Sequence, residues 1–252
     1  MGGLYQACGE GGKHADYVVA LAGNPNTGKS TLFNALTGLN QHTGNWPGKT
    51  VLRAEGIYVY HGKRYRVVDL PGTYSLLAHS PEEEVARDYL CFAQPQVAVA
   101  VVDATCLERN LNLVLQLLEI TSRVVVCVNL LDEAKRKKLR VDIPLLAKQL
   151  GVPVVGITAR EKQGLDVLLE QIEQMALGKI VTHPYTVHYS EEIETSIQCI
   201  EPQIRQLVGE KVNSRWLALR LLEGDIAVIH SFAQWLGQEE RVLYPLGGEI
   251  LA

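Results

Sequence analysis

The segment GNPNTGKS at residues 23–30 restricts the fold of this chain more than any other feature. It matches the pattern GxxxxGK[ST], and it lies between a β-branched run at residues 17–22 and a helical pattern at residues 29–37. In that context the glycines let backbone N–H groups turn toward a phosphate, and the helix N-terminus adds partial positive charge. A chance glycine-rich turn is the alternative, but it does not explain the flanking strand and helix patterns.

The rest of residues 17–177 alternates strand and helix patterns. β-branched runs predict six strands, at residues 17–22, 51–60, 64–69, 97–103, 124–129 and 153–157. Helical patterns occupy residues 29–37, 81–92, 108–120, 143–150 and 165–177. This alternation predicts an α/β P-loop NTPase fold with a six-stranded, mainly parallel sheet. Only His61, Gly62 and Lys63 separate the second run from the third, so one edge strand is expected to run antiparallel.

The strand pattern stops near Gly178, and helical patterns follow at residues 190–208, 213–223 and 225–236. We therefore divide the chain into four expected parts. They are an N-terminal extension at 1–16, an α/β domain at 17–177, a linker at 178–189 and a small all-helical domain at 190–252.

Composition excludes several classes of protein. Hydrophobic residues make up 47% of the 252 residues and charged residues 21%, which is typical of a globular chain. The longest apolar runs, 97–102 and 124–128, fall far short of the roughly 20 residues that span a bilayer, and no secretory signal is visible. The five cysteines are widely spaced without a CxxC pair, so we expect a reducing compartment. The net charge of −4 argues against a nucleic-acid partner.

A nucleoside triphosphate with Mg²⁺ fits the chemistry of the loop. We expect Lys29 to reach the β- and γ-phosphates and Ser30 to ligate Mg²⁺. Asp69 and Gly72 follow a strand, where Asp69 can hold Mg²⁺ through water and the N–H of Gly72 can meet the γ-phosphate. The other predicted nucleotide contacts in the loop are Asn24, Asn26, Thr27, Gly28 and Thr31.

Two later motifs predict that the base is guanine. Asn129 and Asp132 follow the run at 124–129, and the Asp132 carboxylate can accept hydrogen bonds from two guanine donors that adenine lacks. Selection is expected to be strong, because an unpaired buried carboxylate is costly. A simple helix cap is the alternative role for Asp132. Thr158 and Ala159 follow the run at 153–157 and offer backbone N–H groups to the guanine oxygen.

Residues 41–50 contain two glycines and a proline and are predicted to form a mobile loop. We expect Thr50 to bring its hydroxyl to Mg²⁺ only while the γ-phosphate is present, so that the loop is ordered only in the triphosphate state. Trp46 is expected to be exposed, with a core anchor as the alternative. Lys29, Thr50 and Gly72 are the expected catalytic residues.

The segments GNPNTGKSTLFNALTG, GNWPGKT, DLPGTYSL, NLLDEAKRK and ITAR occur in this order, and together they resemble the cytosolic G domain of ferrous iron transport protein B (FeoB). The resemblance covers roughly residues 17–177. It implies a GTPase that binds GTP and GDP, followed by a helical domain described as a guanine-nucleotide dissociation inhibitor. It also implies a membrane iron-transport domain, in the same or a separate chain, as the partner. The expected location is cytoplasmic, at the inner face of the cell membrane.

Asn26 is expected to bind K⁺ through its side-chain carbonyl, because related GTPases with asparagine at this position are often activated by potassium. Such a cation would take the place of an arginine finger. The alternative is that Asn26 only braces the loop through its own backbone.

Four positions depart from the patterns of related GTPases. Lys49 stands where many FeoB-like proteins have an apolar residue, and Leu130 replaces the lysine of the general Asn-Lys-x-Asp motif. Thr158 replaces a more common serine. Thr73 stands where Ras-like GTPases have a water-orienting glutamine, so hydrolysis must position its water by other means and slow turnover is expected.

The sequence therefore predicts a regulatory GTPase that controls ferrous iron uptake by passing its nucleotide state to the helical domain and a membrane transporter. Two alternatives stay open. One is a nucleotide-gated binding switch with incidental hydrolysis. The other is an Era-like ribosome- or RNA-associated GTPase. The net charge of zero over residues 1–177 and the excess of acidic residues after Gly178 argue against it. Homo-oligomer formation is left open.

Overall fold

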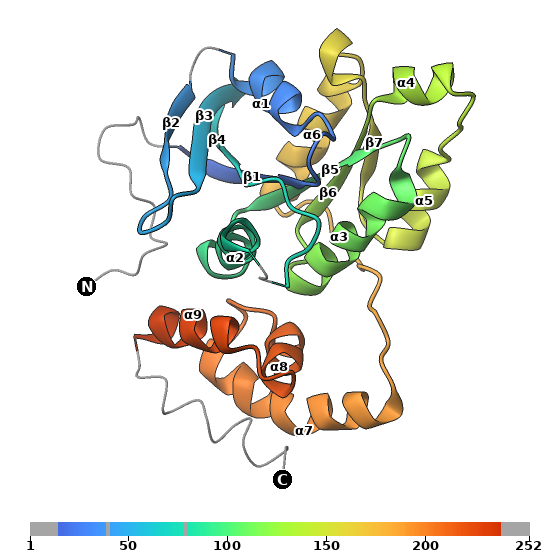
Figure 1. Ribbon diagram of the computed structural model, residues 1–252. Coiled ribbons are helices and arrows are strands. Elements are labelled where there is room, and N and C mark those ends of the chain that lie inside the picture. The colour runs from blue at the N-terminus through green and yellow to red at the C-terminus, as the bar shows by residue number, and fades with distance from the viewer. Residues whose placement is uncertain (1–14, 39–40, 78–79, 238–252) are drawn as a thin grey trace.

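The computed structural model describes residues 15–38, 41–77 and 80–237, which form an α/β domain and a helical domain joined by an extended segment (Figure 1). Most of the expected N-terminal extension, including Cys8, lies outside the described residues. So do residues 238–252 of the expected helical domain.

A seven-stranded sheet forms the centre of the α/β domain, in the order β2-β3-β4-β1-β5-β6-β7. Its strands are β1 (Tyr17–Gly23), β2 (Gln41–Asn45), β3 (Leu52–Tyr60), β4 (Lys63–Asp69), β5 (Val97–Asp103), β6 (Val124–Asn129) and β7 (Val154–Gly156). The five neighbouring strands β4, β1, β5, β6 and β7 are parallel to one another, whereas β3 is antiparallel to both of its neighbours. The mainly parallel α/β fold is confirmed. The count of six strands was wrong, and the antiparallel strand is not at the edge, because β2 lies outside it.

Strand β2 also corrects the expectation that residues 41–50 form a loop throughout. Its sequence QHTGN has no apolar alternation, and its last four residues are exposed. Backbone pairing with β3 builds the strand, from Gln41 opposite Gly56 to Asn45 opposite Leu52. Because this pairing does not depend on the side chains of β2, the sequence pattern carries no sign of it.

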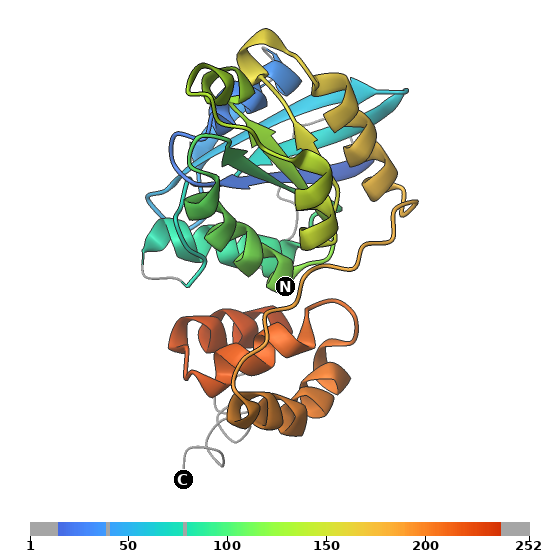
Figure 2. The ribbon, with the colours of Figure 1, turned by 90° about the vertical axis from the view of Figure 1, so that its right-hand side faces the viewer.

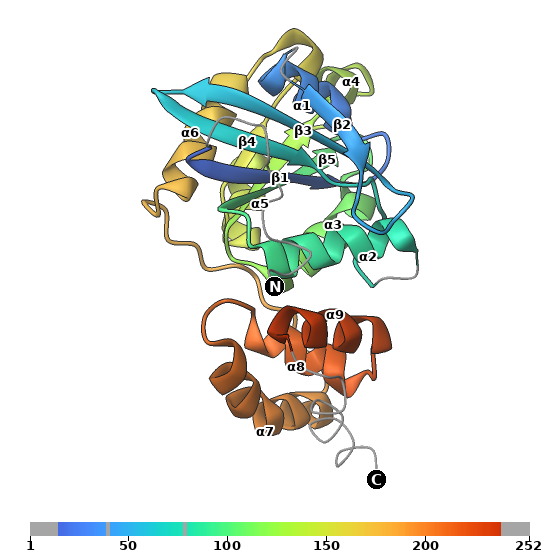
Figure 3. The ribbon, with the colours of Figure 1, turned by 90° about the vertical axis from the view of Figure 1, so that its left-hand side faces the viewer.

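Helices cover both faces of the sheet (Figure 3). One face packs against α1 (Lys29–Thr37) and α6 (Leu165–Ala176). The other packs against α2 (Pro81–Asp88), its π-helical continuation η1 (Tyr89–Ala93), α3 (Leu107–Ile120) and α5 (Ile143–Leu150). The short helices α4 (Leu131–Arg136) and η2 (Ala159–Glu161) complete the domain. Strands β5 and β6 are buried on both sides, which explains their nearly continuous valine runs.

The helical domain contains α7 (Glu191–Val208), α8 (Ser214–Leu222) and α9 (Ile226–Leu236), close to the three expected ranges. Side-chain caps start the last two helices. The Asn213 side chain accepts a hydrogen bond from the Trp216 N–H, and the Asp225 carboxylate accepts one from the Val228 N–H, both at 3.0 Å. Among the described residues, no helix combines the length and apolar character that crossing a bilayer requires.

The segment between α6 and α7 runs along the α/β domain without helix or strand (Figure 2). Its backbone is fixed at α5, where the N–H of His183 donates to the Gly151 carbonyl at 3.1 Å and that of Tyr185 donates to the Leu150 carbonyl at 2.9 Å. Gly151 has φ +69°, and a Cβ atom there would lie 1.8 Å from the His183 carbonyl oxygen. Only glycine therefore allows the linker to pass this close.

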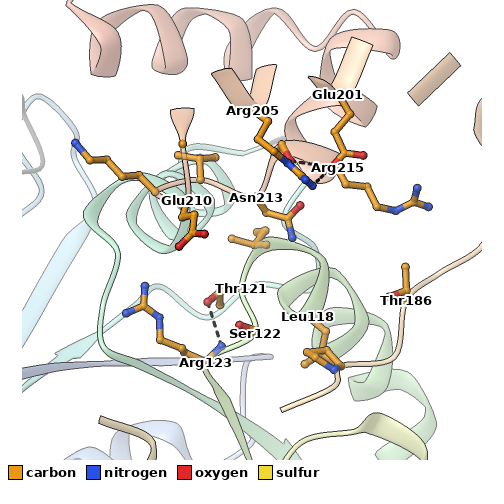
Figure 4. A pocket seen from close by; sticks show the side chains of 16 residues that line it. Leu118, Thr121, Ser122, Arg123, Thr186, Glu201, Arg205, Glu210, Asn213 and Arg215 are labelled. Carbon is orange, nitrogen blue, oxygen red and sulfur yellow. Dashed lines mark hydrogen bonds and ion pairs between the residues drawn. The ribbon is translucent and has the colours of Figure 1, made fainter. Parts of the chain in front are cut away.

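A cavity of about 620 Å³ lies between the two domains and the linker (Figure 4). It is lined by the turn that enters β6, including Arg123, and by the segment between α7 and α8. Two arginines in its wall are already paired, Arg205 with Glu201 at 2.9 Å and Arg215 with Glu194 at 2.7 Å. The cavity lies at the amino end of β6, so it is separate from the residues that follow the carboxyl ends of the strands.

Candidate nucleotide-binding site

The predicted site residues gather at the carboxyl edge of the sheet, because β1, β4, β6 and β7 are parallel and end there. The loop after β1 carries the phosphate motif, and β4 ends at Asp69. β6 ends at Asn129, and Thr158 follows β7. The parallel topology thus brings together four motifs that are far apart in the sequence.

The phosphate loop turns sharply at two residues with positive φ, Asn26 at 66° and Gly28 at 81°. A Cβ atom on Gly28 would lie 2.3 Å from Nδ2 of Asn129, so this position requires glycine for both its conformation and its space. Helix α1 begins at Lys29 without a side-chain cap, which leaves its N-terminal N–H groups available to an anion.

Lys29 and Asp69 form a buried ion pair in the structure. The ammonium group of Lys29 also donates to the Leu70 carbonyl oxygen at 2.6 Å. Burial raises the pKa of the Asp69 carboxyl, and the charge of Lys29 opposes this shift. A triphosphate and Mg²⁺ would supply new partners for both groups. The hydroxyl and carboxylate oxygens of Ser30 and Asp69 are ligands that Mg²⁺ prefers, so the residues present fit this ion.

Asn129 joins the phosphate loop to the loop after β7. Its Nδ2 donates to the Thr27 carbonyl oxygen at 3.0 Å, and its Oδ1 accepts a hydrogen bond from the Ala159 N–H at 3.0 Å. The side chain is buried, and both of its polar atoms are used. Asn129 therefore holds the loop after β7 beside the phosphate loop, and these two loops carry predicted base and phosphate contacts.

A cavity of about 320 Å³ lies beside this junction. Its lining includes the predicted base contacts Asp132 and Thr158, and also Lys135, Glu161 and Gln163, which were not predicted to contact the nucleotide. Oδ2 of Asp132 accepts a hydrogen bond from Nη2 of Arg136 at 3.1 Å, and its side chain is partly exposed. The carboxylate is thus open to a ligand at the edge of a cavity large enough for a purine base.

Other predicted nucleotide contacts have few interactions with the rest of the site. Asn26, Ser30, Thr31 and Thr50 are exposed. Thr50 lies in the turn between β2 and β3, and the described residues give its side chain no hydrogen bond to the phosphate loop. The Asn24 side chain is buried and has no hydrogen-bond partner among the described residues.

The expectation that Trp46 is exposed was wrong, and the alternative of a core anchor holds. Trp46 is 5% exposed. Its ring contacts the Tyr89 ring edge-on at a centroid distance of 5.2 Å, and the guanidinium of Arg53 lies 4.9 Å from the centroid of the Trp46 ring. Lys49, one of the unusual positions, forms an ion pair with Glu84 of α2 at 2.7 Å. Trp46 and Lys49 therefore attach the end of the 41–50 segment to η1 and α2.

We expect the Lys49–Glu84 pair to contribute only about 0.2–1 kcal/mol, because each side chain is about a third exposed and solvent screens the charges. A double-mutant cycle of Lys49→Met and Glu84→Gln, read from urea unfolding, measures this coupling. Lys148→Met in place of Lys49→Met is the control, since Lys148 is exposed on α5 and should show no coupling. A coupling above about 2 kcal/mol would contradict the assignment of a screened pair.

A mainly parallel sheet with a phosphate loop after β1 and a cavity beside the loops after β6 and β7 is typical of the G-domain class of P-loop proteins. Two family models agree with this class. Residues 17–172 match the model of ferrous iron transport protein B, and residues 189–242 match that of the FeoB cytosolic helical domain. The chain belongs to the FeoB family.

Curated relatives and solved structures agree with this family assignment. The Fe(2+) transporter FeoB of Salmonella typhimurium is 39% identical over 212 residues, which cover 82% of this chain and 27% of the relative. The chain thus spans about a quarter of that protein. The cytosolic domain of L. pneumophila FeoB superposes with a TM-score of 0.79 at 32% identity, covering 91% of this chain and 88% of that one. A GDP form of the cytosolic domain of T. maritima FeoB superposes with a TM-score of 0.78 at 35% identity, covering 96% of this chain and 98% of that one.

Proposed function

We propose that this chain is a GTP-binding and GTP-hydrolysing regulatory unit that controls ferrous iron uptake through an attached or partner membrane transporter. The observation that carries the proposal is Asn129, which ties a phosphate loop to a base cavity edged by the Asp132 carboxylate. The similar T. maritima domain in a GDP form supports guanine nucleotides as ligands. FeoB relatives named as Fe(2+) transporters support the link to iron.

The proposed roles follow the geometry of the edge of the sheet. Lys29 leaves Asp69 to bind the β- and γ-phosphates, and Gly72, beside the phosphate loop, offers its N–H to the γ-phosphate. Ser30, Asp69 and Thr50 would hold Mg²⁺. When bound, Mg²⁺ neutralises charge on the phosphate oxygens during transfer to water. Turnover is slow, because Thr73 cannot orient water as a glutamine does.

The remaining contacts concern the base and the cation. The N–H groups of Thr158 and Ala159 are bonded to the Gln163 carbonyl at 3.1 Å and to Oδ1 of Asn129 at 3.0 Å, so at least one of them leaves its partner to contact the guanine oxygen. Asp132 selects the base. Asn24, Thr27, Gly28 and Thr31 line the phosphates, and Asn26 holds K⁺. The proposed boundaries are 17–177 for the α/β domain, 178–189 for the linker and 190–252 for the helical domain. The proposed location is the cytoplasm, and the membrane surface when the chain is joined to a transporter.

A buried polar network links α2 to the helical domain and offers a route for nucleotide state to reach it. Asp88 of α2 accepts a hydrogen bond from the Ser231 hydroxyl of α9 at 2.7 Å. Arg87 pairs with Asp88 at 2.7 Å and lies 3.7 Å from the carboxylate of Asp225. Arg87, Asp88 and Ser231 are all buried. Since α2 follows the loop after Gly72, a movement of that loop would act directly on this network.

We expect Ser231→Ala to destabilise the protein by about 1–3 kcal/mol, because it leaves the buried Asp88 carboxylate without one of its hydrogen bonds. Urea unfolding measures the loss. Ser196→Ala is the matched control, because the Ser196 hydroxyl bonds only within α7, to the Glu192 carbonyl, at an exposed position. Equal stability of the two variants would argue against an energetic link between the domains.

Hydrolysis of GTP and ATP by the purified chain, in Mg²⁺ and K⁺, tests the proposed function directly. We expect hydrolysis of GTP only, and equal rates for both nucleotides would overturn the proposal. Comparing the single-turnover rate with the rate of product release separates a GTPase from a binding switch with incidental hydrolysis. A salt-dependent RNA-binding assay tests the Era-like alternative, which membership of the iron-transport family disfavours.

A further inference from the structure

The segment of residues 73–77 directly follows Gly72 and is tied to the phosphate loop at its start. The N–H of Thr73 donates to the carbonyl oxygen of Gly23 at 3.3 Å. The Thr73 hydroxyl donates to the Ser75 carbonyl at 2.6 Å and accepts a hydrogen bond from the Ser75 N–H at 3.2 Å. Thr73 and Leu76 are buried. The 73–77 segment is thus a compact turn rather than an extended loop.

The far end of the 73–77 segment is held by α3. Oε1 of Gln116 accepts hydrogen bonds from the Leu76 N–H at 2.7 Å and from the Ser75 hydroxyl at 3.3 Å. The guanidinium of Arg109 lies 4.3 Å from the centroid of the Tyr74 ring. A single amide oxygen, 40 residues away in sequence, therefore satisfies a backbone donor and a side-chain donor of this turn.

Gln116 can fix this turn because α3 is itself firmly held. Leu113, Val114 and Leu117 are buried in the core beneath the sheet, while Gln116 lies half-buried on the side that meets the turn. Gly72 is placed next to the phosphate loop, since a Cβ atom added to it would lie 3.5 Å from Cα of Pro25. The position of Gly72 thus depends on two anchors, Gly23 before the turn and Gln116 after it.

We infer that Gln116 is a positioning residue for GTP hydrolysis: it holds the 73–77 segment so that Gly72 stays at the γ-phosphate subsite. Gln116 does not itself touch the phosphates. The inference rests on the proposed function, since it concerns the rate of that reaction. No pattern in the sequence pointed to Gln116, a polar residue within an amphipathic helix.

Two substitutions at one position test the inference. Gln116→Met keeps the length of the side chain but removes the acceptor oxygen, whereas Gln116→Glu keeps an acceptor for the Leu76 N–H and the Ser75 hydroxyl. We expect Gln116→Met to lower the single-turnover rate of GTP hydrolysis at saturating nucleotide by about fivefold, because the hydrogen bonds to the Leu76 N–H and the Ser75 hydroxyl are both lost, with little change in GTP affinity. Gln116→Glu should restore the rate.

Amide hydrogen exchange of the 73–77 segment without nucleotide gives a second measurement that does not depend on activity. Protection of the Leu76 amide should fall in Gln116→Met and return in Gln116→Glu. Asn112→Leu, one turn away at an exposed position of α3, is the control and should leave both measurements unchanged. Ser75→Ala removes the second hydrogen bond to Gln116 together with the acceptor of the Leu77 N–H, and keeps the bond from the Leu76 N–H to Gln116. It should lower the rate while leaving the Leu76 amide protected, and it gives a second test if Gln116→Met folds poorly.

Three results would overturn the inference. The first is an unchanged hydrolysis rate in Gln116→Met although the Leu76 amide has lost its protection. The second is unchanged protection of the Leu76 amide in Gln116→Met. The third is a hydrolysis rate in Gln116→Glu that is as low as in Gln116→Met. Absence of GTP hydrolysis by the unmodified chain would instead reject the proposed function, while the exchange measurement would still report whether Gln116 holds the turn.

Discussion

Asp132→Asn is expected to lower the affinity for GTP by about 100-fold or more, and to make xanthosine triphosphate the preferred nucleotide. The carboxylate of Asp132 is placed at the edge of the base cavity, where it can accept from both N1–H and the exocyclic amine of guanine. An asparagine amide replaces one acceptor by a donor, which repels the guanine amine and matches the oxygen of xanthine. Titration of a fluorescent analogue of each nucleotide measures the change.

Glu133→Gln is the matched control for this substitution. Glu133 is the next residue on α4 and lies 3.8 Å from the Arg136 guanidinium, but it does not line the base cavity. The same chemical change at this position should leave GTP affinity unaltered. If Asp132→Asn binds GTP as tightly as the unmodified chain, Asp132 only caps or braces α4, and base selection lies elsewhere in the cavity.

Hydrolysis is expected to be about tenfold or more faster in KCl than in NaCl of equal concentration. A K⁺ ion held by the Asn26 carbonyl and phosphate oxygens would stabilise charge that builds between the β- and γ-phosphates, and so supply part of the effect of an arginine finger. The smaller Na⁺ fits such a site less well. Asn26 is exposed at the phosphate loop with φ 66°, so its side chain is free to turn toward a ligand.

Two substitutions of Asn26 are needed to test this prediction, because its backbone has a positive φ. Asn26→Ala removes the carbonyl but also strains the backbone, whereas Asn26→Gly removes it without strain. Both variants should lose the difference between the two salts, and Asn26→Gly should retain GTP binding. Identical rates of the unmodified chain in KCl and NaCl would remove the cation from the mechanism. A potassium effect that survives in both variants would keep the cation but reject Asn26 as its ligand.

The sequence by itself determined the features whose cause is local. The valine runs of β5 and β6, the glycine-rich turn into α1, and the caps Asn213 and Asp225 each depend on residues within a few positions of one another. The parallel strand order follows from the same alternation of elements, so the meeting of the phosphate loop with Asp69 and Asn129 could be expected. For this reason the fold class and the edge of the sheet that carries the site were predictable.

Tertiary structure alone decided the features that depend on contacts between distant segments. Strand β2 exists through backbone pairing with β3, and Trp46 is buried because Tyr89 and Arg53 lie beside it. The Ser231–Asp88 bond and the contact of Gln116 with Leu76 join residues 143 and 40 positions apart. Polar side chains such as these show no periodicity, and their partners are set by how rigid helices and the sheet pack. No local pattern in the chain could reveal them.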